Sequence, residues 1–384
     1  MPATNMHTTM HHTSSVLAEA DRLMVVCNSC RYCEGLCAVF PAMEMRRIFT
    51  DGDLNYLANL CHGCGACYFD CQFSPPHEFE VNVPGALAKA RIESYRTYAW
   101  PRFLSGLFAR NGVAVGTIAA LSALVFLAGF FVSYDPDVLQ KIYSGPGAFY
   151  VFMPHNIMVL IFGAAFLYAI VSIAIGALSF WRDIGEPVAA LSAPAPLWQA
   201  TVDAAQLKYL DGGEGGCASA EDQPKDQSKD RRKIFHHLTF YGFALCFAST
   251  VVATAYHYLL GREAPYAWYD LPVILGTLGG LGLVIGPVGL FTAKSKRDPV
   301  LLDPGSYGMD VAFIFILSAT GLTGLALLVL RDTSFMSTLL ALHLGVVFAL
   351  FLLLPYGKFM HGIYRFLALA RYAKERGTHQ PASE

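Results

Sequence analysis

Long apolar runs dominate the second part of the chain. Six of them follow one another, and short polar stretches separate them. They cover residues 112–133, 152–180, 234–260, 271–292, 309–330 and 335–357. Each run is about long enough to cross ~30 Å of hydrocarbon as a helix that rises 1.5 Å per residue. The pattern predicts six membrane-spanning helices, which places both ends of the chain on one side of the membrane.

Residues 16–100 show a different, mixed pattern. Leu17, Ala20 and Met24 recur at helical spacing, and short apolar patterns follow at 42–48 and 54–60. This predicts one small, mainly helical soluble domain. Residues 1–15 carry His7, His11 and His12 but no apolar core of the kind that a signal peptide needs. We expect a disordered tail there, in preference to a histidine metal site.

These patterns divide the chain into consecutive parts. The stretch 181–233, which links the second and third spans, is rich in proline, glycine and charged residues, and we expect it to be an exposed loop. With 54% hydrophobic and 15% charged residues, the composition is that of a membrane protein. The predicted parts are the tail 1–15, the soluble domain 16–100, the first two spans 101–180, the linker 181–233, four further spans 234–375 and a C-terminal tail 376–384.

Positive charges are unevenly shared between the two ends of the predicted spans. One end has only Lys141, Arg262 and Arg331. Because cytoplasmic flanks collect lysine and arginine, the richer end is expected to be cytoplasmic. This predicts a multi-pass protein of the inner (cytoplasmic) membrane, with the soluble domain, the linker and the C-terminus in the cytoplasm. The richer end carries Arg102, Arg110, Arg182, Arg231, Arg232, Lys233, Lys294, Lys296, Arg297, Lys358, Arg365, Arg371, Lys374 and Arg376.

Eight of the ten cysteines form two runs of identical spacing, C-x2-C-x2-C-x3-C, 34 residues apart. Such runs supply the soft thiolate ligands of [4Fe–4S] clusters, and in two-cluster proteins the fourth cysteine ligates the other cluster. A zinc site or a disulfide framework fits this spacing and a cytoplasmic face less well. We therefore predict a first cluster on Cys27, Cys30, Cys33 and Cys71, and a second on Cys61, Cys64, Cys67 and Cys37. Cys217 has no neighbouring cysteine with which to build a site.

Histidines recur in two of the predicted spans. The third span has His236, His237 and His257, and the sixth has His343 and His361. Imidazoles on facing helices hold haem b, although each histidine could instead be a hydrogen-bonded or interfacial side chain.

The two spans run antiparallel, so the histidines fall into an inner and an outer pair. His257 and His343 form the predicted outer pair. The 18 residues between His343 and His361 equal five helical turns, which keeps both on one face. The inner partner of His361 is either His236 or His237. One or two haems are expected, with His155 as a reserve ligand or quinone-site residue.

The glycine-rich stretch 276–282 lies inside an apolar span with no strand before it, so it does not predict a dinucleotide site. Small residues there are expected to let helices approach closely. We expect no flavin in this chain, so any flavin would belong to another subunit.

Three stretches carry a resemblance to a known family. They are Cys71-Gln-Phe-Ser-Pro-Pro-His-Glu-Phe-Glu-Val-Asn-Val-Pro84, Phe235-His-His-Leu-Thr-Phe-Tyr-Gly-Phe243 and Ala264-Pro-Tyr266. Nearly the whole chain resembles the tricarballylate-utilisation protein B family, the CitB-type iron–sulfur membrane proteins. The resemblance implies an FAD-dependent partner that dehydrogenates tricarballylate to cis-aconitate and is reoxidised by this subunit. Independently, His343, Pro355 and His361 resemble the last haem-bearing helix of the nitrate-reductase gamma subunit.

The sequence thus predicts an all-α protein, in which a helical ferredoxin-like two-cluster domain precedes a six-helix cytochrome b-like bundle. The expected function is electron transfer from a flavoprotein through the clusters and haem b to quinone, with no nucleic-acid partner. One alternative is a different donor, a flavoprotein of the citrate or dicarboxylate type. Another is a membrane anchor or redox sensor that conducts no current.

Overall fold

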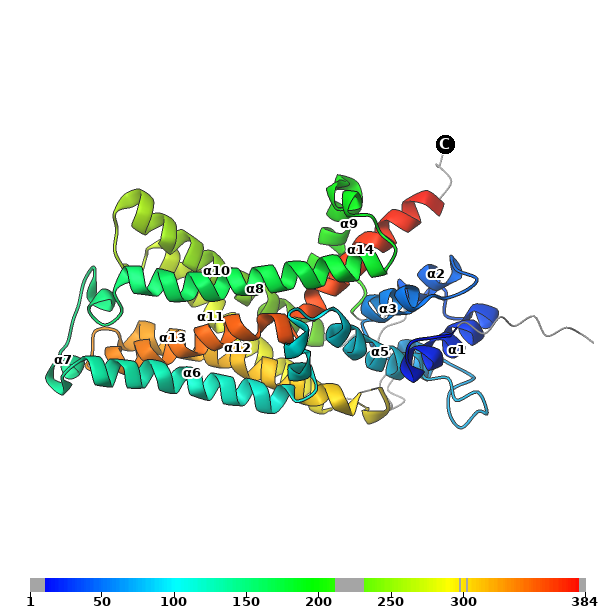
Figure 1. The fold of residues 1–384 in the computed structure, drawn as a ribbon, viewed down its shortest axis with the longest axis horizontal. Coiled ribbons are helices and arrows are strands. Elements are labelled where there is room, and N and C mark those ends of the chain that lie inside the picture. Colours follow the sequence, from blue (N-terminus) through cyan, green and yellow to red (C-terminus); the bar gives the residue numbers. More distant parts are fainter. Residues whose placement is uncertain (1–10, 211–230, 297, 302, 380–384) are drawn as a thin grey trace, which may run out of the picture.

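The computed structural model describes residues 11–210, 231–296, 298–301 and 303–379. The described chain is helical, with no strand in it, as the sequence predicts. Figure 1 shows a small helical domain at one end of an elongated bundle, and α7 at the opposite end.

The N-terminal domain contains five helices. Leu17, Ala20 and Met24, which the apolar pattern places on one helical face, are buried in its core. Thr50 and Asp53 form a capping box that begins the third helix. The helices are α1 (Ser15–Cys30), α2 (Val39–Glu44), α3 (Asp51–Leu60), α4 (Ala66–Phe69) and α5 (Val83–Tyr98).

In the described part of the chain, six helices are long and apolar enough to cross a membrane, and they coincide with the six predicted spans. They are α6 (Asn111–Ser133), α8 (His155–Asp183), α10 (Arg231–Leu260), α11 (Leu271–Ser295), α12 (Pro304–Leu330) and α13 (Met336–Leu353), the last continued by a 3-10 turn, η6 (Leu354–Tyr356). The protein is therefore a membrane protein. Short elements connect them: α7 (Pro136–Gln140) and the 3-10 turns η1 (Arg102–Phe108), η2 (Ala148–Val151), η3 (Val188–Ser192) and η5 (Pro299–Leu301).

Glycines let α10 and α11 pack closely along their length. A Cβ at Gly282 would lie 2.7 Å from the carbonyl oxygen of Leu238, and one at Gly279 would lie 2.8 Å from that of Gly242. Neither position has room for a side chain. The expectation that small residues in 276–282 allow close helix approach is confirmed.

Two further helices lie where the sequence pattern predicted none. Helix α9 (Pro194–Ala205) occupies part of the linker that we expected to be a loop, and α14 (Met360–His379) follows the sixth span. They pack against each other beside the N-terminal domain (Figure 1). The predicted tail 1–15 is also too long. His12 Nδ1 lies 2.7 Å from Asp51 Oδ1, and Ser14 caps α1, so ordered structure begins before residue 15.

The N-terminal domain is joined directly to the bundle. Its core continues into α8 and α14 without interruption. The Tyr98 hydroxyl donates to Asp183 at the end of α8, and the Asn55 side chain lies 3.3 Å from the same carboxylate. Gly52 is required at this junction, because a Cβ would lie 2.1 Å from the Asp183 carbonyl oxygen.

Candidate functional site: two cysteine cavities beside a histidine pair

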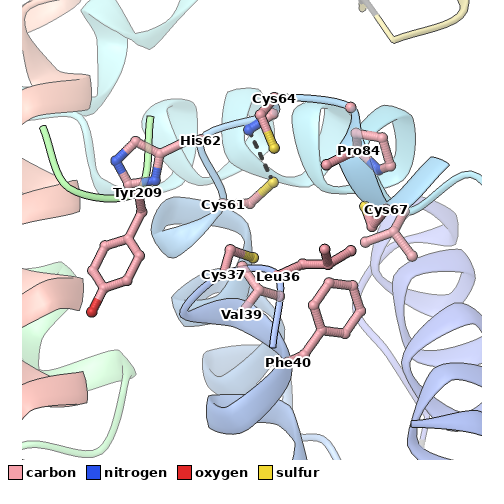
Figure 2. A pocket seen from close by; sticks show the side chains of 14 residues that line it. Leu36, Cys37, Val39, Phe40, Cys61, His62, Cys64, Cys67, Pro84 and Tyr209 are labelled. Atoms are coloured by element: carbon pink, nitrogen blue, oxygen red, sulfur yellow. Dashed lines mark hydrogen bonds between the residues drawn. The ribbon is translucent and has the colours of Figure 1, made fainter. Parts of the chain in front are cut away.

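One cavity, called the second cavity after the predicted second cluster, gathers Cys37, Cys61, Cys64 and Cys67 (Figure 2). Cys37 lies just before α2, Cys61 ends α3, and Cys67 lies in α4. Gly63 and Gly65 between them have φ of 59° and 95°, a left-handed conformation that glycine adopts without strain. This turn lets the Gly63 N–H donate to Cys61 Sγ at 3.2 Å, the dashed line in Figure 2.

The other cavity, called the first cavity after the predicted first cluster, is lined by Cys27, Cys30, Cys33, Cys67 and Cys71. Cys27 and Cys30 occupy the last turn of α1, which ends in a left-handed residue at Arg31. That reversal returns the chain so that Cys33 joins the other two. Apolar side chains, including Val26, Phe40, Phe73, Val81 and Val83, form the walls.

Each cavity contains cysteines of both runs: the second combines Cys37 with Cys61, Cys64 and Cys67, and the first combines Cys27, Cys30 and Cys33 with Cys71 and Cys67, so that Cys67 lines both. Among the described residues, no three His, Cys, Asp or Glu side chains are arranged to hold a metal ion. Four thiolates of a [4Fe–4S] cube bind four separate irons, so they need not converge on one point. Cys217 lies outside the described residues.

The thiols are crowded in apolar surroundings. Burial, together with neighbouring sulfurs, raises the pKa of Cys27 to about 12 and that of Cys37 to about 12. The same causes raise the pKa of Cys33 to about 11. Bare thiolates are thus disfavoured here, and a polycationic iron core would supply the compensating charge and displace the protons.

Two arginines meet at the backbone of Cys61. Arg91 Nη2 donates to the Cys61 carbonyl oxygen at 2.6 Å, and Arg365 Nη2 donates to the same oxygen at 2.8 Å. Beside them, burial lowers the pKa of His62 well below its usual value, and the charges of Arg365 and Arg91 lower it further. The sequence pattern assigns none of these residues to the site, because an isolated arginine carries no spacing signal.

The inner histidine pair is His236 with His361. Their ring centroids lie 6.1 Å apart, with the rings edge to face. His237 points away towards α9, where its Nε2 lies 3.1 Å from the Ala205 carbonyl oxygen. Burial, with the charges of Lys358 and Arg365, lowers the pKa of His361 well below its usual value. It is therefore the neutral imidazole that coordinates metals.

The prediction that His343 and His361 share one continuous helix is wrong. Helix α13 ends at Leu353, and Gly357 has an extended backbone before α14 begins at Met360. Pro355 lies in the intervening 3-10 turn, since a proline cannot donate the next helical hydrogen bond. His361 therefore reaches His236 from a separate helix.

The predicted outer pair is also wrong. The His257 ring stacks on His155 at 3.6 Å between centroids, and Tyr150 and Tyr258 surround this pair. His343 instead lies 2.9 Å from the Thr323 hydroxyl on α12. Helical periodicity gives the position of a histidine along the helix axis and the face on which it lies. It does not specify which helices are neighbours. The sequence consequently missed the partner of His155.

Comparison with known proteins agrees with this architecture. The family model described as Citrate utilization protein B Fer4-like domain matches residues 20–97, and the model described as Citrate utilization protein B matches residues 107–382. A relative from Escherichia coli, "Citrate utilization protein B", is 49% identical over 360 residues, which are 94% of this chain and 92% of the relative. No solved structure matches the chain. The chain belongs to the citrate utilization protein B family.

Proposed function

We propose that this chain is the membrane-bound electron-transfer subunit of an oxidoreductase complex. In this proposal it reoxidises an FAD-dependent dehydrogenase through two [4Fe–4S] clusters and haem b, and delivers the electrons to the quinone pool. One observation carries the proposal: the domain with both cysteine cavities is joined to the end of the bundle where His236 meets His361.

The cavities support the proposed ligand sets, in which Cys67, which lines both cavities, is assigned to the second cluster with the rest of its run. Cys27, Cys30, Cys33 and Cys71 would hold the first cluster, and Cys61, Cys64, Cys67 and Cys37 the second. His236 and His361 would hold haem b. Such clusters and haem exchange single electrons, whereas flavin and quinone exchange pairs, so the chain links two-electron partners. The His155 and His257 rings stack too closely for a haem between them, and His155 is proposed to border a quinone site.

The charges support a cytoplasmic N-terminal domain. Arg182, Arg231 and Lys294 lie at the ends of the spans next to this domain. Lys141, Arg262 and Arg331 lie at the opposite ends, beyond α7, α10 and α12. By the positive-inside rule, the domain would face the cytoplasm, where a soluble flavoprotein can dock.

The donor is proposed to be a flavoprotein that dehydrogenates tricarballylate. The name of the E. coli relative favours a second candidate, a flavoprotein of citrate metabolism. Both acids carry three carboxylates on the same carbon skeleton, and the choice between them would belong to the partner. The two cavities described above present thiols within largely apolar walls, which are not surroundings that suit three carboxylates.

The test is reconstitution of purified chain in vesicles with the candidate flavoprotein. Adding tricarballylate should reduce both a haem b absorbance band and the cluster signals in electron paramagnetic resonance (EPR), and a quinone analogue should then restore the oxidised spectra. Citrate in place of tricarballylate decides between the two donors. Spectra that never change with either acid, despite a reduced flavin on the partner, would contradict the proposed function.

A further inference from the structure

We infer that Arg91 and Arg365 are positioning residues that raise the electron affinity of the second cluster, and so direct electrons from the first cavity towards His361. This inference rests on the proposed function. It concerns the junction between the second cysteine cavity and the inner histidine pair. Neither arginine is proposed as a ligand of a cluster or of haem.

The two guanidinium groups reach one atom from different helices. Arg91 comes from α5 and Arg365 from α14, and both donate to the carbonyl oxygen of Cys61 at 2.6 and 2.8 Å. Further bonds fix them in place: Arg91 Nε donates to Ala58 at 2.8 Å and Arg365 Nε to Asn59 at 3.3 Å. The end of α3 is thereby held by two cations at the residue that begins the second cysteine run.

Neither charge is balanced by a nearby carboxylate. Within the described ranges, no Asp or Glu oxygen lies within 4.0 Å of Arg91 or Arg365, whereas the buried Arg46 and Arg371 each contact both Asp53 and Glu375. Two neighbouring cations in a partly buried place repel each other and lose hydration. An anion would offset both costs, and four thiolates around an iron–sulfur core carry net negative charge.

The first cavity has the opposite surroundings. The carboxylate of Asp70 lines it. Adding an electron makes a cluster more negative, which nearby cations favour and nearby carboxylates oppose. The second cluster is therefore the better acceptor of the two, and electrons entering at the first cavity move inwards.

Arg365 also joins the second cavity to the histidine pair. It lies four residues after His361 on α14, so both side chains lie on the same side of the helix. A chain of contacts thus runs from Cys61 through Arg365 to the helix that carries His361.

The test is an EPR-monitored redox titration of the purified full chain with Arg365→Gln, Arg365→Lys and Arg91→Gln, beside Arg96→Gln. Arg96 is an exposed residue of α5, and its substitution removes the same charge without a contact to Cys61. The iron content of each variant is measured as well. If Arg365→Gln loses iron, the cluster potentials of Arg365→Lys and Arg91→Gln test the inference instead.

We expect Arg365→Gln to lower the more positive of the two cluster potentials, with about a tenfold loss in electron affinity, or about 59 mV for a one-electron couple. Arg91→Gln should shift the same potential, Arg365→Lys should shift it less, and Arg96→Gln should leave it unchanged. Unchanged potentials in both Gln variants with full iron content would overturn the inference and leave the proposed function standing. Wild-type protein without any cluster signal would overturn both.

Discussion

His236 and His237 are neighbours in sequence with different surroundings. His236 faces the ring of His361, while His237 lies against the backbone of α9. Only one of them can hold a group shared with His361. We predict that His236→Ala and His361→Ala each abolish haem b binding, because a bis-imidazole site needs both ligands.

The matched control is His237→Ala, which removes an imidazole one position away and should retain haem. Haem per polypeptide, from the absorbance of the pyridine complex, measures all three variants. Equal haem loss in His237→Ala and His236→Ala would show that the pair is wrongly assigned.

Cys37 belongs to the first cysteine run by sequence but to the second cavity by position. We predict that Cys37→Ser removes the same cluster signal as Cys64→Ser, and a different one from Cys30→Ser, because cross-ligation pairs the runs. Each variant should lose about half of the iron. Cys246→Ser, in the span α10, should keep both signals. A Cys37→Ser spectrum that matches Cys30→Ser would mean that each run binds its own cluster.

At the scale of elements, the sequence predicts what depends on local pattern. The lengths of the apolar runs predicted the six spans found among the described residues, and each cysteine cavity contains thiols of both runs. Packing between distant helices has no such local signature. The docking of α14 on α9 and the stacking of His155 on His257 arise from helix neighbours that periodicity does not specify.

The helices α3 and α14 are tied together by a buried ionic cluster. Arg46 and Arg371 donate to Asp53 at 2.8 and 3.1 Å, and both also contact Glu375. Burial alone would raise the pKa of Asp53. Hydrogen bonds from Arg46 and Thr50, with the charges of Arg46 and Arg371, outweigh it and hold the pKa below the usual value.

We therefore predict that Asp53→Asn lowers the free energy of unfolding of the N-terminal domain by about 2 kcal/mol at pH 7, less than for a fully buried pair. Because the pKa is depressed in the folded state, the wild-type stabilisation is present above about pH 4 and is lost as the pH falls through the folded value. Thermal unfolding from pH 7 to 3 should show this loss in wild type and a flatter profile in Asp53→Asn. Glu19→Gln, at an exposed pair with Arg22, is the control and should change little. A control as unstable as Asp53→Asn would contradict the role of the cluster.

At the scale of the whole molecule, the residues that line the two cysteine cavities lie outside the spans, and the histidine pairs lie within or beside them. Arg365 on the helix of His361 contacts Cys61 of the second cavity, and the inner pair and the His155–His257 pair lie near opposite ends of α10. A sensor or an anchor has no use for such a series, because it needs only the end that its partner contacts. An electron-transfer subunit needs every one of these sites. If one site is removed, the electrons should remain on the cofactors that precede it.

This difference gives the last prediction. In vesicles with the partner flavoprotein and its substrate, His361→Ala should retain its iron and still accept electrons in the N-terminal domain, because the cysteine cavities are intact. Its reoxidation by a quinone analogue should slow by at least about a hundredfold, since transfer would lack its step at the membrane boundary. Freeze-quenched EPR follows the reduction of the clusters, and stopped-flow absorbance follows their reoxidation by the quinone analogue. His237→Ala is the control variant and should behave as wild type. If His361→Ala were reoxidised at the wild-type rate, electrons would leave the chain before the bundle. The non-conducting interpretation would then be the better account of this fold.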